Sequence, residues 1–388
     1  MRSKLAKSLV IIAGFGVALL GLLAGALSFI PPLIGREEIN LLSAIVGASL
    51  VAVGIGLGLP LAWQGLNSWR CRPSRSFRPW PAWALALAFI VAVSLGQTVL
   101  SLKLMPLLFF PPLHIMATAL PSWIVLASIG RRLAGVRWRE VIFQMASGAF
   151  LATSGTFILE LALALLLSLI VFTAVALRPS GAAWLQELLI NLQNPAWLKE
   201  PNNVLQLLLS PAVLVILASL ILFIAPLVEE FLKSLGVVIM WAKRPSKAQA
   251  FLWGLAGGAG FAMVEGLFSG AMAIEGWSAV TLMRAGAAAV HCLGSGLMGL
   301  GWYYLLTFHR LWLFLGAYAA SVSIHAFWNA ASGGMVFILL NLTLASGQFN
   351  RTVGSMLILL LTGLLALYSL VAFMLIHYIG IRVTRPLN

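Results

Sequence analysis

Long apolar stretches alternate with short polar segments along nearly the whole chain of 388 residues. About 20 consecutive apolar residues are needed for an α-helix to cross a lipid bilayer. We predict one membrane-spanning helix for each of these ranges: 8–30, 41–63, 83–105, 107–130, 142–177, 205–241, 249–274, 284–306, 311–340 and 355–378. The pattern therefore predicts an all-α, polytopic transmembrane helix bundle of about ten helices.

Two of these stretches are longer than one crossing requires. We expect 142–177 to begin as an interfacial segment, and 205–241 contains Pro226, which should kink or interrupt its helix. The segment 178–204 between them carries tryptophan and charged residues, and it predicts a short amphipathic helix on the outer leaflet.

The composition excludes a water-soluble globular enzyme. Only 9% of the residues are charged and 61% are apolar, whereas soluble domains contain about 25% charged residues. The net charge of +14 comes from Lys and Arg concentrated in connections on one side. This distribution predicts that both termini are cytoplasmic, and it accounts for the basic residues without a nucleic-acid partner. All ten acidic residues are Glu, which excludes mechanisms built on an aspartate pair.

Three ionisable residues fall within one predicted span, in the sequence Glu229-Glu230-Phe231-Leu232-Lys233. Each such charge costs roughly 2.5–3.5 kcal/mol at the centre of a membrane helix, so the group is a candidate functional site. Lys233 is four residues from Glu229 and three from Glu230, and both spacings allow an ion pair on one helix face. Pairing with one carboxylate would leave the other for chemistry.

The next three predicted spans each add polar groups near mid-membrane depth. Glu265 follows a glycine-rich stretch, His291 follows Arg284 by two turns, and His325 precedes Asn329 by one turn. We expect these groups to meet in a polar cavity at mid-membrane depth. A glutamate there can accept a proton from water, and imidazoles can bind a metal or stabilise an oxyanion. The sequence contains neither HExxH nor G-x-S-x-G.

Taken together, the order and spacing of these motifs resemble the PrsW family of intramembrane proteases, distant relatives of the CAAX-prenyl-type membrane proteases. The resemblance covers roughly residues 205–335 and rests on these motifs: Glu229-Glu230-x-x-Lys233, Phe261-x-x-x-Glu265, Arg284 before His291, and His325 before Trp328-Asn329. It implies a metallopeptidase in a bacterial cytoplasmic (inner) membrane. The implied substrate is a membrane-anchored protein, such as an anti-sigma-type protein.

The resemblance also implies a role for each motif residue. Glu229, Glu230 and His291 are the implied catalytic residues, and Glu265, His291 and His325 are the implied metal ligands. Lys233, Arg284 and Asn329 are expected to orient them. His and Glu ligands suit Zn²⁺, although spacing alone leaves a metal-free glutamate mechanism open. Asn329 stands where the family often has Asp, and a neutral amide cannot replace an anionic ligand.

The motifs divide the chain into three expected parts. Residues 1–204 are N-terminal transmembrane helices and an outer loop without an assigned motif, 205–340 are the catalytic helix core, and 341–388 are a last helix and tail. Two other functions fit a polar membrane bundle. One is a non-catalytic scaffold subunit in which polar groups hold helices together, and the other is a proton- or cation-coupled transporter.

Overall fold

The computed structural model describes residues 4–30, 40–132, 135–344 and 350–384. These residues form α-helices with a few π and 3₁₀ turns, and in this part of the chain the only β-type pairing is a bridge between Ser76 and Arg137. Nine helices of the described ranges are long and apolar enough to cross a membrane. The predicted all-α, polytopic fold is therefore confirmed.

The remaining predicted span, 284–306, lies within α15 (Trp277–Phe308), a helix of 32 residues. Its length suffices for a crossing, but it is not among the nine most apolar helices. Its many glycines, together with His291 and Ser295, lower its mean hydropathy below that of the others. The helix is therefore less apolar because it carries part of the polar site described below.

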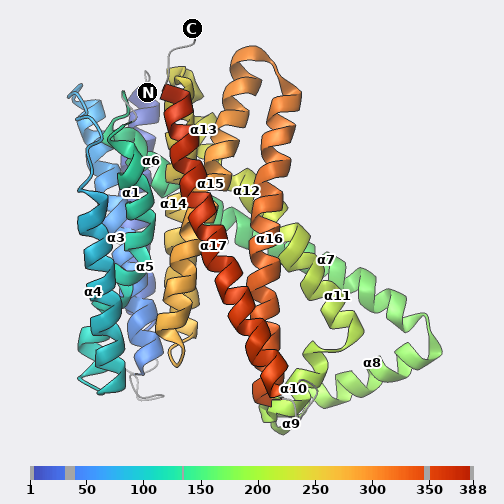
Figure 1. The fold of residues 1–388 in the computed structure, drawn as a ribbon. Helices are drawn as coiled ribbons and strands as arrows, with labels where there is room; N and C mark the ends of the chain where they lie inside the picture. The colour runs from blue at the N-terminus through green and yellow to red at the C-terminus, as the bar shows by residue number, and fades with distance from the viewer. Residues whose placement is uncertain (1–3, 31–39, 133–134, 345–349, 385–388) are drawn as a thin grey trace. The chain divides into compact units, whose positions relative to one another are not determined.

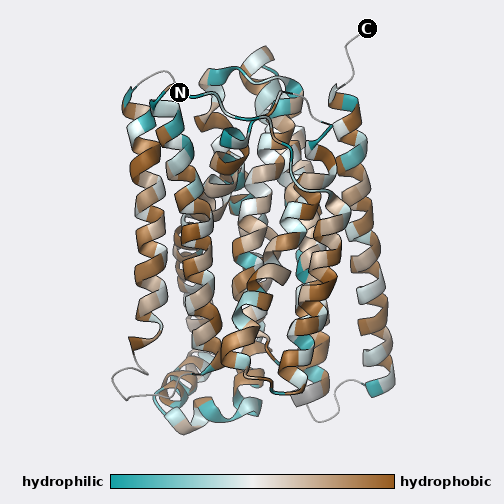
Figure 2. Ribbon diagram, turned by 90° about the vertical axis from the view of Figure 1, so that its left-hand side faces the viewer, coloured by the Kyte–Doolittle hydropathy of each residue, from teal (hydrophilic) through white to brown (hydrophobic). Residues whose placement is uncertain are grey.

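The chain forms two compact units, and each consists of segments that are separate in the sequence. The first unit contains Met1–Thr153, Glu230–Ser321 and Ser369–Asn388, and the second contains Ser154–Glu229 and Val322–Tyr368. α12, α16 and α17 each run from one unit into the other, and α7 does so by its first residue. Apolar residues predominate along the middle of the helices, and hydrophilic residues are concentrated toward the ends (Figure 2).

The first unit is built from paired antiparallel helices. α1 (Lys4–Leu27) packs along α3 (Leu41–Trp69), α4 (Ala82–Ser101) packs on α5 (Pro106–Gly130), and α14 (Lys247–Met272) packs on α15 (Figure 1). The unit also holds α6 (Trp138–Ala146), the π turn η1 (Ser147–Ala152), α13 (Leu235–Ile239) and the 3₁₀ turn η3 (Trp241–Lys243).

α14 is the central helix of the first unit, and every residue from Ala250 to Val264 is buried. Two of its glycines permit close approach of the backbones that carry polar residues. A Cβ at Gly257 would lie 2.5 Å from the carbonyl oxygen of Lys233, and a Cβ at Gly258 would contact the carbonyl oxygen of His291. Because glycine has no side chain, both backbones pack directly on α14.

The second unit contains most of α7 (Thr153–Ala176), followed by α8 (Pro179–Leu192), α9 (Pro195–Lys199), α10 (Pro201–Leu208) and α11 (Pro211–Ser219). It also contains the middle of α16 (Leu311–Leu344) and the first half of α17 (Arg351–Thr384). The predicted helix within 178–204 is present as α8. None of the residues of α8 is buried. Its position on the outer leaflet stays a prediction.

The helix around Pro226 is interrupted, as the sequence predicts. The π turn η2 (Leu220–Ile224) directly precedes α12 (Ala225–Lys233), which contains Pro226. Proline has no backbone N–H and therefore cannot continue the regular hydrogen-bond ladder. A comparable π turn, η1, joins α6 to α7 within the other overlong stretch. An interfacial start for that stretch is untested.

Candidate active site

Five titratable side chains of the first unit form a continuous chain of contacts. Lys233 Nζ lies 3.0 Å from Glu230 Oε1 and 2.8 Å from His291 Nδ1. On the other side of the imidazole, His291 Nε2 lies 2.8 Å from Glu265 Oε2. Arg284 Nη2 pairs with the same Glu265 oxygen. These contacts join residues of α12, α14 and α15, and the two carboxylates alternate with the two cations.

The contacts fix the hydrogen-bonding state of His291. A Lys ammonium can only donate, so Nδ1 of His291 accepts its hydrogen bond. In a neutral imidazole the other nitrogen, Nε2, then carries the proton, and it faces the Glu265 carboxylate at 2.8 Å. Arg284 forms an ion pair with the same carboxylate. Opposite charges at such short range offset much of the desolvation penalty of these partly or fully buried side chains.

Packing holds the Glu230–Lys233 pair in place. Both side chains are almost fully buried, at 1% exposure each. Lys233 Nζ lies 4.0 Å from the centre of the Phe261 ring, a cation–π contact. A Cβ at Gly294 would lie 2.5 Å from Glu230 Oε2, so a larger residue there would force this carboxylate to shift. Gly294 lies about one turn after His291 on α15, and no sequence motif singles it out.

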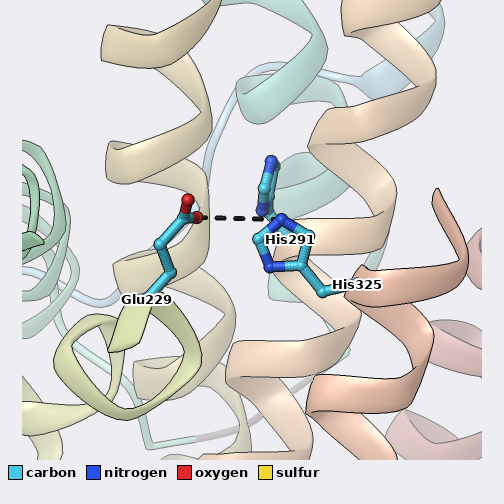
Figure 3. A group of neighbouring side chains, drawn as sticks. All are labelled: Glu229, His291 and His325. Carbon is cyan, nitrogen blue, oxygen red and sulfur yellow. Dashed lines mark ion pairs between the residues drawn. The ribbon is translucent and has the colours of Figure 1, made fainter. Parts of the chain in front are cut away.

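Glu229 and His325 form a separate contact in the second unit. Both are buried, and Glu229 Oε2 lies 3.8 Å from His325 Nε2, with the carboxylate turned toward the imidazole (Figure 3). This distance is longer than a hydrogen bond. Adjacent residues of a helix point about 100° apart. Glu229 and its neighbour Glu230 therefore serve different partners.

Asn329 bonds to the backbone of a neighbouring helical segment. Its Nδ2 donates to the carbonyl oxygen of Ile221 at 3.0 Å, within the second unit. Ile221 belongs to the π turn η2. Asn329 therefore ties α16 to the segment that leads into α12. An orienting role of Asn329 toward His325 stays a prediction.

The structure thus distributes the predicted site residues over both units. Glu230, Lys233, Glu265, Arg284 and His291 lie together in the first, and Glu229, His325 and Asn329 lie in the second. Another buried histidine belongs to neither group. His114 Nδ1 accepts from Trp277 Nε1 at 2.9 Å, and its Nε2 lies 3.0 Å from the carbonyl oxygen of Leu267. Both ring nitrogens are engaged in packing contacts between α5, α14 and α15.

Comparison with known proteins agrees with this chemistry. The model of the PrsW family intramembrane metalloproteases matches residues 136–359, which is more than half of the chain and includes every predicted site residue. No curated protein and no solved structure matches the chain. The chain therefore belongs to the PrsW family of intramembrane metalloproteases, and it is an integral membrane protein that hydrolyses peptide bonds of protein substrates in the membrane.

Proposed function

We propose that Glu229, His291 and His325, the side chains drawn in Figure 3, hold a zinc ion that takes part in hydrolysis of a membrane-anchored protein. Two imidazoles and a carboxylate, with one position left for water, are a common ligand set of catalytic zinc. Residues 205–340 are then the catalytic core, as the motifs predict. The proposed substrate is a single-span protein of the anti-sigma type.

The spacing between Glu229 and His325 is the observation that carries this proposal. Ligand atoms held about 2.0–2.1 Å from zinc at tetrahedral angles lie about 3.3–3.4 Å apart. The 3.8 Å between Glu229 Oε2 and His325 Nε2 is near that value and too long for a hydrogen bond. Both side chains are buried, which suits a site that restricts water. The two donors therefore fit a metal in type and in spacing.

Helix register supports His291 as the third ligand. Within the first unit, α15 and the start of α16 run antiparallel: Trp302 packs on Phe314, and Ser321 Oγ donates to the carbonyl oxygen of Gly294 at 2.8 Å. His325 follows Ser321 by four residues, and His291 precedes Gly294 by three. Because both helices are continuous, this register predicts that the two imidazoles lie level with each other.

The metal would polarise the scissile carbonyl and lower the pKa of a water molecule. His291 would contribute Nε2 and, because a metal replaces a proton, the Lys233–His291 pair would release one. Glu265 would then lose its imidazole donor and become the carboxylate that accepts a proton from water. Arg284 would keep Glu265 ionised and oriented. Glu230 would act by holding Lys233 against His291.

The proposal also includes an orientation in the membrane. The first turn of α1 and the last turn of α17 lie at the same end of the first unit (Figure 1). This arrangement and the distribution of Lys and Arg support two cytoplasmic termini in a bacterial inner membrane. Reporter domains fused to either end should be active only on the cytoplasmic side.

Cleavage of a defined membrane substrate tests the proposed function. A single-span protein with a different tag on each side of the membrane should be cut by the wild-type chain. Glu229→Ala, Glu230→Ala and His291→Ala should abolish cleavage while the protein is still made. His377→Gln is the matched control, because His377 Nδ1 lies 2.9 Å from the carbonyl oxygen of Phe373 in its own helix and its ring packs on the Phe373 ring, away from the predicted site residues. Unchanged cleavage by the three Ala variants would refute the assignment.

A further inference from the structure

We propose that a groove in the second unit, between α10–η2 and α16, binds an apolar transmembrane segment of the protein substrate. The groove has a volume of about 350 Å³, and its walls include Leu208, Leu217, Ile221, Asn329, Gly333 and Phe337. This inference rests on the proposed function, since it assigns a substrate-binding surface to the same site.

The groove and His325 share one face of α16. Asn329, Gly333 and Phe337 follow His325 at intervals of four residues, and all three line the groove. Residues four apart are neighbours on a helix surface, with a turn of about 40° from one to the next. A segment in the groove would therefore extend along α16 toward His325.

The opposite wall leads to Glu229. It is formed by α10, α11 and the π turn η2, and η2 continues directly into α12, which carries Glu229. Asn329 Nδ2 donates to the Ile221 carbonyl oxygen, which joins the two walls at this point. Single π turns occur frequently at functional sites. Both walls of the groove thus run into the pair formed by Glu229 and His325.

The lining suits a peptide segment better than a lipid chain. Space is open beside the backbone of α16, because a Cβ at Gly333 or Gly334 would meet nothing within 4 Å. Small residues on a membrane helix allow another helix to approach closely. With Nδ2 of Asn329 bonded to Ile221, its amide oxygen can accept from a backbone N–H that an unwound part of the substrate segment exposes. An acyl chain has no such donor.

Photocrosslinking tests the groove without requiring catalysis. A photoreactive residue replaces Phe337 in the groove or, as the control, Leu359 on α17, which is 74% exposed. The full-length chain is embedded in phosphatidylcholine nanodiscs with a biotin-labelled transmembrane peptide of leucine and alanine. We expect the peptide to crosslink at 337 and not at 359. Crosslinks to lipid alone at 337, or equal peptide crosslinks at both positions, would overturn the proposal.

A steric variant gives the matched second test. Gly333→Leu adds a Cβ that meets nothing within 4 Å, so its side chain should fill the groove. The peptide crosslink at 337 should then fall about tenfold, which corresponds to about 1.4 kcal/mol. Gly363→Leu on α17 should leave the crosslink unchanged, because a Cβ there also meets nothing within 4 Å. An unchanged crosslink in Gly333→Leu would overturn the proposal that the groove binds the peptide. Zinc content, measured in the same samples, reports on the proposed catalytic site independently.

Discussion

Nζ of Lys233 lies 2.8 Å from Nδ1 of His291, although the two residues are 58 positions apart in the chain. Both side chains are almost fully buried. The contact joins the carboxylate–ammonium pair of α12 to the imidazole–carboxylate pair of α15 and α14. Each side chain in this series of contacts thus compensates the charge or polarity of a neighbour, so removal of one side chain should disturb the others.

Lys233→Met should destabilise the protein strongly. Removal of one partner of a buried ion pair costs about 3–5 kcal/mol, because the other charge stays in a poorly solvated place. In the double variant Glu230→Gln/Lys233→Met, much of the stability should return while activity stays low. Thermal unfolding in detergent measures the first effect and substrate cleavage the second. Equal stability of Lys233→Met and wild type would contradict the buried pair.

Glu265→Gln should impair chemistry more than folding. A positioned general base contributes typically about 10²–10⁴-fold to the rate. We therefore expect kcat to fall by about that factor, with zinc still bound. Glu275→Gln is the control, since Glu275 lies in the turn between α14 and α15. A Glu265→Gln variant with wild-type kcat would exclude Glu265 as the base.

Gly258→Ala should displace the helix that carries His291. The added Cβ would contact the His291 carbonyl oxygen, and overpacking of this kind costs typically about 1–3 kcal/mol. Gly266→Ala on the same helix is the control, because its Cβ would meet only Thr118 atoms at 3.8 and 3.9 Å. Stability and cleavage should both fall in the first variant and be retained in the second. Equal stability and cleavage of the two variants would contradict a role of the close approach at Gly258 in positioning His291.

Trp277→Phe should show that His114 contributes to stability and not to catalysis. It removes the indole N–H that donates to His114 Nδ1 and leaves a buried acceptor unsatisfied, at a cost of about 1–3 kcal/mol. The melting temperature should fall, while kcat per folded molecule should stay at the wild-type value. A fall in kcat with unchanged stability would instead assign His114 to the catalytic site.

Much of the fold and of the site could be predicted because the bilayer imposes strong constraints on sequence. Apolar length predicts the spans, and the high cost of a charge in lipid singles out Glu229, Glu230 and Lys233. Local spacing could not choose the partner of Lys233, because both glutamates lie within reach on one helix. The contact with Glu230 depends on α15, where Gly294 leaves room for the carboxylate.

Other features depended on tertiary packing that spacing cannot encode. The pairing of Arg284 with Glu265 requires α14 and α15 to lie side by side, at a separation set by the glycines of α14. The bond from Asn329 to Ile221 depends on a π turn, for which the apolar sequence Leu220–Ile224 has no distinctive signal. The sequence indicated that Pro226 would interrupt the helix, but it did not indicate that the adjacent π turn would accept a hydrogen bond from Asn329.

Zinc content of the purified chain tests the central claim most directly. After purification from zinc-supplemented cells, elemental mass spectrometry should find about one zinc per chain in the wild type and in His377→Gln. Glu229→Gln, His291→Ala and His325→Ala should each lose most of it, because a three-ligand site tolerates little loss. Wild-type zinc content in His325→Ala, or a folded and active wild type without any bound metal, would contradict the account.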